Sequence, residues 1–173
     1  MSTRAKIARP RGDSWEGVYH HFDGYPTGLG STLWALALSP PAIASGSLDN
    51  MMRLLLDEHS AGWSNIQGVD WSAPIGFGSA RGPACYCHGQ RSEKPQPLAT
   101  PETMDSDAWL FAEWVYVIDP ERRTFSVICG MVPVDDGYGC RLLGTFPLDG
   151  EEPDWTGLEL LGQRTRYPEE VPA

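Results

Sequence analysis

A strand, a tight turn and a helix are encoded one after another in residues 17–39, and this unit constrains the fold more than any other segment. Apolar and polar side chains alternate up to Phe22, as they do in a half-buried strand. The tetrapeptide Asp-Gly-Tyr-Pro that starts at Asp23 is typical of a tight turn. The helix that follows is apolar almost all round, and two consecutive prolines end it after Ser39. The unit therefore predicts a strand joined to a buried helix.

Similar patterns along the chain predict an α+β fold, a small antiparallel sheet packed with two to three helices. The 19 glycines and 15 prolines indicate many turns and argue against a helical bundle, and 41% hydrophobic with 21% charged residues is typical of a globular chain. Strands are expected at 15–22, 109–118, 124–132 and 140–148. Helices are expected at 27–39, 47–59 and 154–163.

The domain organisation expected from these elements is simple. Residues 1–13 are predicted to be a flexible basic arm, residues 14–167 a single α+β domain, and residues 168–173 a disordered tail. No apolar run is long enough for a membrane span, and the basic start of the chain is not followed by the apolar stretch of a secretory signal. A cytoplasmic location with four reduced cysteines is the expectation that follows.

The charge distribution bears on the class of partner. The chain has a formal net charge of -10, although residues 1–12 contain four basic residues and no acid. A body of this sign repels phosphate backbones, which argues against nucleic acid as a general partner. The surplus of acid either serves solubility or forms a surface for a basic protein, as in a protein that mimics nucleic acid.

The turn at residues 23–32 is a candidate site for a small anion or a nucleotide. Glycines allow backbone N–H groups to approach a ligand closely, hydroxyls add donors, and a helix N-terminus favours negative charge. A histidine and an aspartate at the end of the preceding strand would lie beside such a ligand. The ligand-binding residues expected on this basis are His21, Asp23, Tyr25, Gly28, Gly30, Ser31 and Thr32.

A structural role explains the same residues. Asp23 would then bond the backbone of its own turn, and the glycines would only satisfy backbone angles that other residues avoid. The spacing of the glycines is not that of a phosphate-binding loop or of a dinucleotide fingerprint, and no lysine follows Gly30.

A second candidate is a metal site. Cys85, Cys87 and His88 place two thiols and an imidazole within four residues. A zinc ion would need a fourth ligand, and Cys129, Cys140 and His59 are the alternatives. Paired cysteines in structural zinc sites are more often separated by at least two residues, so loop residues without a metal are the competing interpretation.

Catalysis is the rival function. His20 or His21 with Asp23 would form an acid–base pair, although neighbouring residues of a strand point to opposite faces, so at most one histidine reaches the carboxylate. The cluster from Cys85 to His88 would supply a nucleophile or a metal. Since no triad or nucleophile-elbow signature orders these residues, the sequence favours a protein that is not an enzyme.

The segment His-Phe-Asp-Gly-Tyr-Pro that starts at His21 resembles a motif of uncharacterised small phage and bacterial proteins, in which a strand ends in His-Trp-Asp-Gly-Tyr-Pro and a helix follows. Phe22 stands at the tryptophan position. The segment Trp114-Val115-Tyr116 matches a hairpin of the same proteins. The resemblance implies a folded module and an accessory protein of a phage or mobile element. With the turn, it favours a non-catalytic binding module for a small anionic ligand, a nucleotide or a protein partner.

Overall fold

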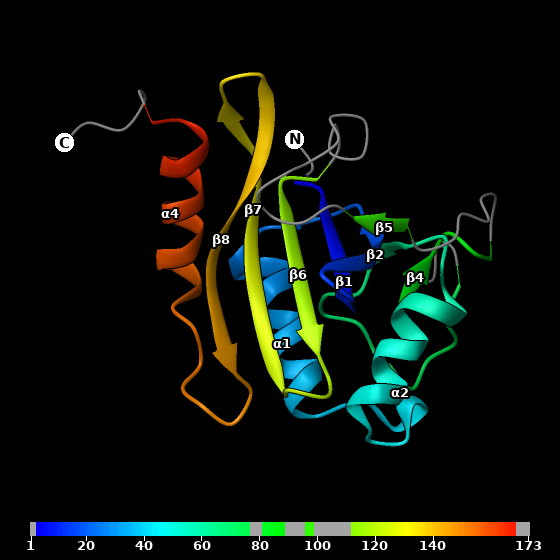
Figure 1. Ribbon diagram of the computed structural model, residues 1–173. Helices are drawn as coiled ribbons and strands as arrows, with labels where there is room; N and C mark the ends of the chain where they lie inside the picture. The colour runs from blue at the N-terminus through cyan, green and yellow to red at the C-terminus, as the bar shows by residue number, and fades with distance from the viewer. Residues whose placement is uncertain (1–2, 77–80, 89–95, 99–111, 169–173) are drawn as a thin grey trace.

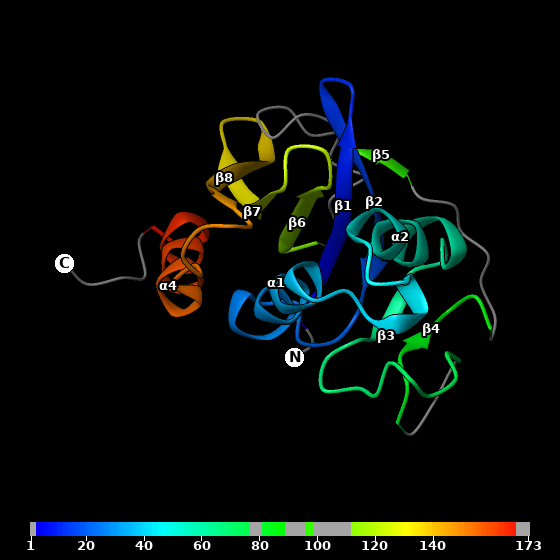
Figure 2. The same cartoon turned by 90° about the horizontal axis from the view of Figure 1, so that it is seen from below.

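The computed structural model describes residues 3–76, 81–88, 96–98 and 112–168. Within them, eight strands form one sheet, and the helices α1, α2 and α4 pack against one of its faces (Figures 1 and 2). The strands are β1 (Ala5–Arg11), β2 (Ser14–His20), β3 (Trp63–Asn65), β4 (Ala84–Cys85), β5 (Gln96–Leu98), β6 (Trp114–Asp119), β7 (Thr124–Val134) and β8 (Gly137–Pro147). The helices are α1 (Ser31–Leu38), α2 (Leu48–Arg53) and α4 (Trp155–Arg166). A single π-turn, η1 (Pro26–Gly30), precedes α1, and another, η3 (Leu54–Glu58), follows α2. A 3-10 turn, η2 (Ala42–Ala44), lies between α1 and α2.

The sheet is mixed. Its strands run in the order β4-β3-β2-β1-β6-β7-β8, and β5 pairs with β2 beside this path. An antiparallel hairpin of β1 and β2 occupies the centre, and β6, β7 and β8 form an antiparallel meander. The two parts join where β1 pairs in parallel with β6, from Ala5 opposite Trp114 to Ala8 opposite Val117. A second parallel contact links β2 to β3.

The predicted α+β class is confirmed, but the predicted small antiparallel sheet is wrong in size and in strand direction. The alternation of side chains predicts a strand and which of its faces is exposed. It does not predict which distant strand pairs with it, because that pairing leaves no pattern in the nearby sequence. The three short strands between α2 and β6 were missed for the same reason, since each has too few residues to show a period.

The prediction of a flexible arm at residues 1–13 is also wrong, because Ala5–Arg11 is a central strand. Ala5 and Ile7 are fully buried. Two of the basic residues that suggested an arm, Arg9 and Arg11, are held in ion pairs: the guanidinium of Arg9 contacts Glu16 and Asp57 at 2.7 Å, and that of Arg11 contacts Glu16 at 2.9 Å. The domain therefore begins upstream of residue 14, while residues 1–2 and most of the predicted tail at 168–173 lie outside the described residues.

The main core lies between the sheet and the helices. Ser47 caps α2 by accepting from the N–H of Asn50, and Asp154 caps α4 by accepting from the N–H of Gly157 at 2.9 Å. The hydroxyl of Tyr116 donates to the carbonyl of Gly24 at 2.8 Å and so ties the core to the turn after β2. The largest fully buried side chains are Trp63, Trp114, Tyr116, Phe125, Ile7, Leu29, Leu33, Met51, Met52, Leu55 and Leu56.

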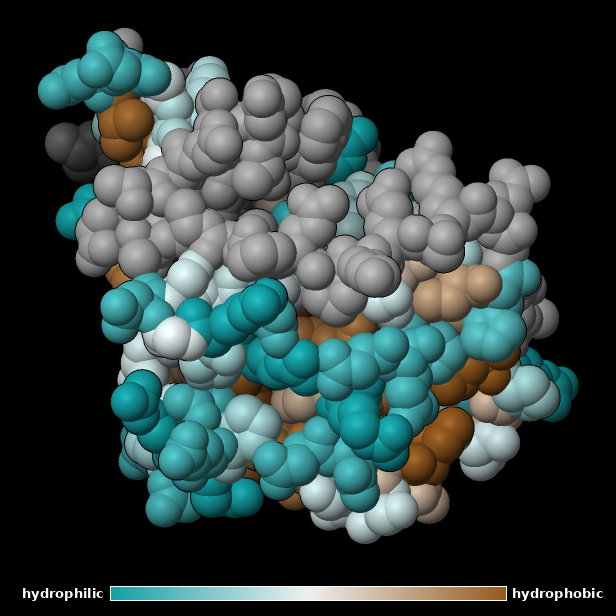
Figure 3. Space-filling view, turned by 45° about the vertical axis from the view of Figure 1, so that its right-hand side comes forward, coloured by the Kyte–Doolittle hydropathy of each residue, from teal (hydrophilic) through white to brown (hydrophobic). Residues whose placement is uncertain are grey.

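The surface carries both hydrophilic and hydrophobic residues. Hydrophilic residues make up most of the described surface visible in Figure 3, with small hydrophobic areas between them. A search of the described residues for a helix of sufficient length and apolarity to cross a membrane found none.

Candidate metal centre

Four potential metal ligands meet at the β4 edge of the sheet. His59 follows η3, at the end of the α2 segment, and Cys85 is the last residue of β4. Strands β3 and β4 pair with Trp63 opposite Cys85, which brings the residues before β3 next to the residues after β4. Cys87 and His88 lie in the turn that follows β4, so two segments 26 residues apart supply the cluster.

The ligand atoms of this cluster are close together. Nδ1 of His59 lies 3.2 Å from Sγ of Cys85, and Nδ1 of His88 lies 2.9 Å from the same sulfur. The ligand atoms of His59, Cys85 and Cys87 all lie within 4.8 Å of one another. The rings of His59 and His88 are 5.4 Å apart, centroid to centroid. The arrangement therefore gathers two sulfurs and the nitrogen of His59, with the nitrogen of His88 beside Cys85.

These distances suit a tetrahedral ion. Zinc–sulfur and zinc–nitrogen bonds of about 2.3 and 2.0 Å place neighbouring ligand atoms about 3.3–3.8 Å apart at the tetrahedral angle. The two shortest separations, both to Cys85, are slightly below that range, so small side-chain rotations suffice to admit an ion.

Burial sets the protonation of the two inner ligands. Cys85 is fully buried and His59 is nearly so, whereas Cys87 and His88 are exposed. Burial raises the pKa of the Cys85 thiol and, together with His88, lowers the pKa of the His59 imidazole. The imidazole is therefore held in the neutral form that binds metals. The thiol keeps its proton until a cation replaces it.

Neighbouring side chains hold the inner histidine in place. The ring of Trp63 packs against the ring of His59 with centroids 4.7 Å apart, and its Nε1 donates to the carbonyl of Leu55 at 2.9 Å. The backbone N–H of Ala61 points at Sγ of Cys87, 3.4 Å away. Two ligands are thus oriented by contacts that do not involve a metal.

The structure brings together the predicted Cys85, Cys87 and His88, and among the three alternatives for a fourth ligand it selects His59. Cys129 and Cys140 lie on β7 and β8, at the opposite end of the strand order. Because His59 lies far from the other three ligands along the chain, no local sequence pattern linked it to them.

The turn at 23–32 uses most of its backbone donors internally. The N–H groups of Gly28 and Leu29 bond the carbonyls of Tyr25 and Asp23 at 3.0 Å, and the N–H of Gly30 bonds Tyr25 at 3.4 Å. The hydroxyls of Ser31 and Thr32 donate back to carbonyls of the preceding turn.

The negative group at this turn comes from the chain itself. Oε2 of Glu159, on α4, accepts from the hydroxyl of Thr27 at 2.7 Å and from its N–H at 3.4 Å. Gly28 and Gly30 serve close packing: a Cβ on the first would lie 2.6 Å from the carbonyl of Asp23, and one on the second 3.0 Å from the Tyr116 ring. The predicted turn therefore already holds a carboxylate at its helix start, while His21 contacts Tyr19 instead.

The two histidines before this turn have separate environments. Nδ1 of His21 lies 2.7 Å from the hydroxyl of Tyr19. His20 is fully buried, and within the described part of the chain neither of its ring nitrogens has a hydrogen-bond partner of good geometry. Burial, reinforced by the charge of His21 and opposed by the nearby amide of Gln67, lowers the pKa of His20 to about 3. His20 is therefore neutral and part of the core.

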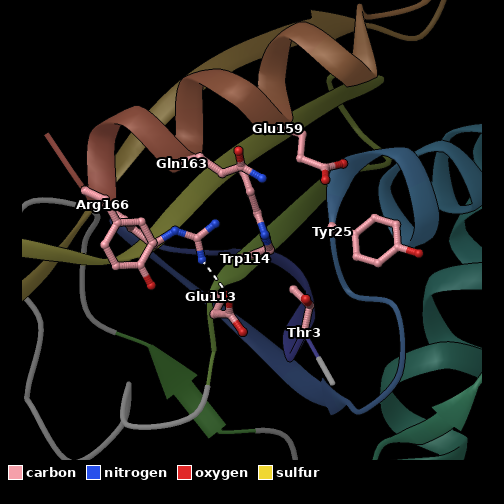
Figure 4. Close-up of a pocket in the computed structure, with 8 residues that line it drawn as sticks. Thr3, Tyr25, Glu113, Trp114, Glu159, Gln163 and Arg166 are labelled. Atoms are coloured by element: carbon pink, nitrogen blue, oxygen red, sulfur yellow. Dashed lines mark hydrogen bonds and ion pairs between the residues drawn. The ribbon is translucent and has the colours of Figure 1, made fainter. Parts of the chain in front are cut away.

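A cavity of about 410 Å³ was not anticipated from the sequence. It lies between α4, the turn after β2 and the starts of β1 and β6 (Figure 4). Its walls include Tyr25, Glu113, Trp114, Glu159, Gln163 and Arg166. Glu159 and Gln163 flank the face of α4 that packs on the sheet through Leu158 and Gly162, and such a polar flank gives no sequence signal of a cavity.

Comparison with known proteins does not identify the chain. No family model matches it, and neither the curated proteins nor the solved structures contain a match. The functional argument therefore depends on the geometry of the two sites described above.

Proposed function

We propose that this protein binds one zinc ion through His59, Cys85, Cys87 and His88. The observation that supports the proposal is the group of His59, Cys85 and Cys87, whose ligand atoms come from segments 26 residues apart and lie within 4.8 Å of one another. Nδ1 of His88 lies 2.9 Å from Sγ of Cys85 and is the candidate for the fourth ligand atom.

Zinc is favoured by the chemistry of the donors. Thiolate and imidazole are soft or borderline ligands, whereas magnesium and calcium require oxygen ligands. Two thiolates with two neutral imidazoles neutralise the divalent charge. This balance suits a partly buried position where Cys85 and His59 are removed from water.

The role that four protein ligands favour is structural. A catalytic zinc ion keeps one position for water or substrate, while a site with four protein ligands is closed. An ion here would join the end of η3 to the turn after β4, two segments that lie side by side through the short pairing of β3 with β4. Because the unfolded chain lacks the preformed site, the free energy of zinc binding would contribute to the free energy of folding.

The wider function that we propose is a zinc-stabilised, non-catalytic binding module. The net charge of -10 supports a positively charged partner or ligand. The anion site proposed for residues 23–32 receives less support, because Glu159 already places a carboxylate at that helix start. A metal-dependent enzyme would need one of the four ligands to dissociate, and the exposed His88 is the candidate for that step.

Elemental analysis of the purified protein tests the zinc proposal. The expected result is one zinc ion per chain, lost in Cys85→Ser and His59→Ala. Cys140→Ser is the matched control, because it removes a cysteine on β8 and should leave the zinc content unchanged. Cobalt substitution adds a spectroscopic test, since Co²⁺ in a tetrahedral site of two thiolates and two imidazoles gives intense visible absorption. Zinc content equal in the wild type and in Cys85→Ser would rule out the site.

A further inference from the structure

The cavity beside α4 has an electrostatic character that the zinc proposal does not use. Three ionisable side chains that are charged at neutral pH line it among the described residues: Glu113, Glu159 and Arg166. Glu113 immediately precedes β6, the other two lie on α4, and Figure 4 shows all three around the same space. Two carboxylates against one guanidinium leave the lining with a net negative charge.

The positive charge in the cavity is already neutralised. Nη1 of Arg166 donates to Oε2 of Glu113 at 2.9 Å, and the guanidinium carbon lies 4.7 Å from the centroid of the Trp114 ring. The side chain of Arg166 is only 4% exposed. An incoming anion would thus meet a guanidinium that is paired, stacked and largely covered, next to a carboxylate that repels it.

Glu159 supplies the negative charge that remains. The hydroxyl and N–H of Thr27 both donate to its Oε2 and so fix the carboxylate, and no hydrogen bond to its Oε1 is seen in the described segments. The ring of Tyr25 stands on the same side of the cavity (Figure 4). A fixed carboxylate with a free oxygen beside an aromatic ring is an arrangement that binds an organic cation.

Arg166 gives an independent indication that a ligand belongs here. Its Nε is buried and makes no hydrogen bond to any residue that the structure describes. Its one hydrogen bond to those residues is the bond from Nη1 to Glu113. A buried donor without a partner costs free energy, so an acceptor at this end of the cavity would be favourable.

We propose that this cavity binds a small organic cation, an alkylammonium or alkylguanidinium group, that also carries a neutral hydrogen-bond acceptor. The cation contacts Glu159 and the ring of Tyr25, and the acceptor faces Arg166 and Gln163. Residues 159 and 166 are seven positions apart on α4, which is about 10 Å along a helix axis. A chain of five or six atoms between the two groups of the ligand fits this spacing.

Four probes of similar shape test the charge requirement by calorimetry on the protein as purified. They are 6-aminohexanamide, hexylammonium, hexanamide and hexanoate. We expect 6-aminohexanamide to bind most tightly, hexylammonium less tightly, and the neutral and anionic probes at least tenfold more weakly than hexylammonium. Hexanoate binding as tightly as hexylammonium, or no probe binding at all, would refute the proposal.

Matched variants locate the binding. Glu159→Gln should weaken binding of both cations at least tenfold and leave the affinity for hexanamide unchanged. Glu151→Gln removes the same charge from an exposed residue ahead of α4 and should change the cation affinity less than twofold. Equal losses in the two variants would mean that only the overall charge of the protein attracts cations, against the proposal. Tyr25→Leu should weaken cation binding several-fold and spare hexanamide.

A peptide distinguishes the two sources of such a cation. Acetyl-Gly-Lys-Gly-amide carries the same ammonium group on a lysine side chain. Tighter binding than 6-aminohexanamide supports the cation site and indicates a basic protein segment as its source. Weaker binding with the same dependence on Glu159 supports the site and indicates a free small molecule. The result is independent of the zinc proposal, because Cys85→Ser tests the zinc site alone.

Discussion

Gly162 faces the indole of Trp114 so closely that a Cβ on residue 162 would collide with Cη2 of the ring. The glycine lets α4 lie against the start of β6, and the same ring stacks on Arg166. Gly162→Ala should therefore destabilise the protein by about 1 kcal/mol, since an overpacking cost of roughly 1–3 kcal/mol exceeds the gain in helix propensity of about 1 kcal/mol. Urea unfolding measures the change.

A double-mutant cycle checks the cause of that loss. In a Trp114→Phe background the smaller ring leaves room for the added methyl group, so Gly162→Ala should cost about 1 kcal/mol less than in the wild type. The same cost in both backgrounds would show that the Trp114 ring does not limit residue 162.

Removal of the partner of Arg166 should be costly. Glu113→Gln leaves a buried guanidinium that has lost its only ion pair with the residues that the structure describes, and the free energy of unfolding should fall by about 2–4 kcal/mol. The carboxylate of Glu113 is partly exposed, which places the expectation below the values for fully buried pairs. Asp119→Asn is the control, because its contact with Arg122 is long at 3.8 Å and Arg122 is 81% exposed. An amide oxygen can still accept from the N–H groups of Glu121 and Arg122, so a loss below about 1 kcal/mol is expected there. Similar losses in the two variants would contradict this account.

His20 should make stability depend on pH. Its folded pKa of about 3 lies below the unfolded value of about 6.5, so the unfolded chain takes up a proton first as the pH falls. Stability is then unaffected above pH 6.5 or so and falls by up to about 1.4 kcal/mol per pH unit between there and pH 3. Urea unfolding of the wild type and of His20→Gln at pH 7, 5.5 and 4.5 measures the contribution of His20 to stability, because every other titratable group is the same in the two proteins. Parallel pH profiles would show that His20 does not titrate in this way.

Zinc removal should lower the melting temperature. If free zinc exceeds its dissociation constant a thousandfold, binding stabilises the fold by about 4 kcal/mol, which corresponds to roughly 10 °C for a chain of this size. We expect the chelator EDTA to produce this shift in the wild type and none in Cys85→Ser. His88→Ala should give an intermediate shift, because His88 is an exposed ligand and three others remain. A melting temperature insensitive to the chelator in the wild type would argue against a structural ion.

The parts of the fold that could be predicted have local signals. The turn at Asp23 and the caps at Ser47 and Asp154 specify their elements within a few residues, and all three lie where the sequence indicates. The meander of β6, β7 and β8 follows for the same reason, because turns separate strands of clear alternation. β1 was missed because its lysine and arginines resemble those of a solvated arm. The acidic partners of Arg9, which make its charge compatible with a strand, lie in other segments.

The candidate sites likewise combine residues that have a local sequence signal with residues that have none. Cys85, Cys87 and His88 are adjacent in sequence and were found together, whereas His59 joins them through the pairing of β3 with β4, which no local pattern specifies. The cavity could not be predicted, because Tyr25, Glu113 and Arg166 come from three distant segments. Sequence reasoning also placed an anion at the start of η1 without the means to know that Glu159 arrives there from α4.

The parallel pairing of β1 with β6 has a consequence for biosynthesis. Ala5 meets Trp114, a residue that leaves the ribosome 109 positions later. Until then the β1–β2 hairpin exposes an unpaired apolar edge in the nascent chain, the kind of edge that recruits other strands. Closure of so long a loop also slows folding, since contacts of high sequence separation form late. Deletion of the first eleven residues would remove the seam between the two halves of the sheet, and yields of soluble protein should respond more to changes at this terminus than to changes at the surface of α4.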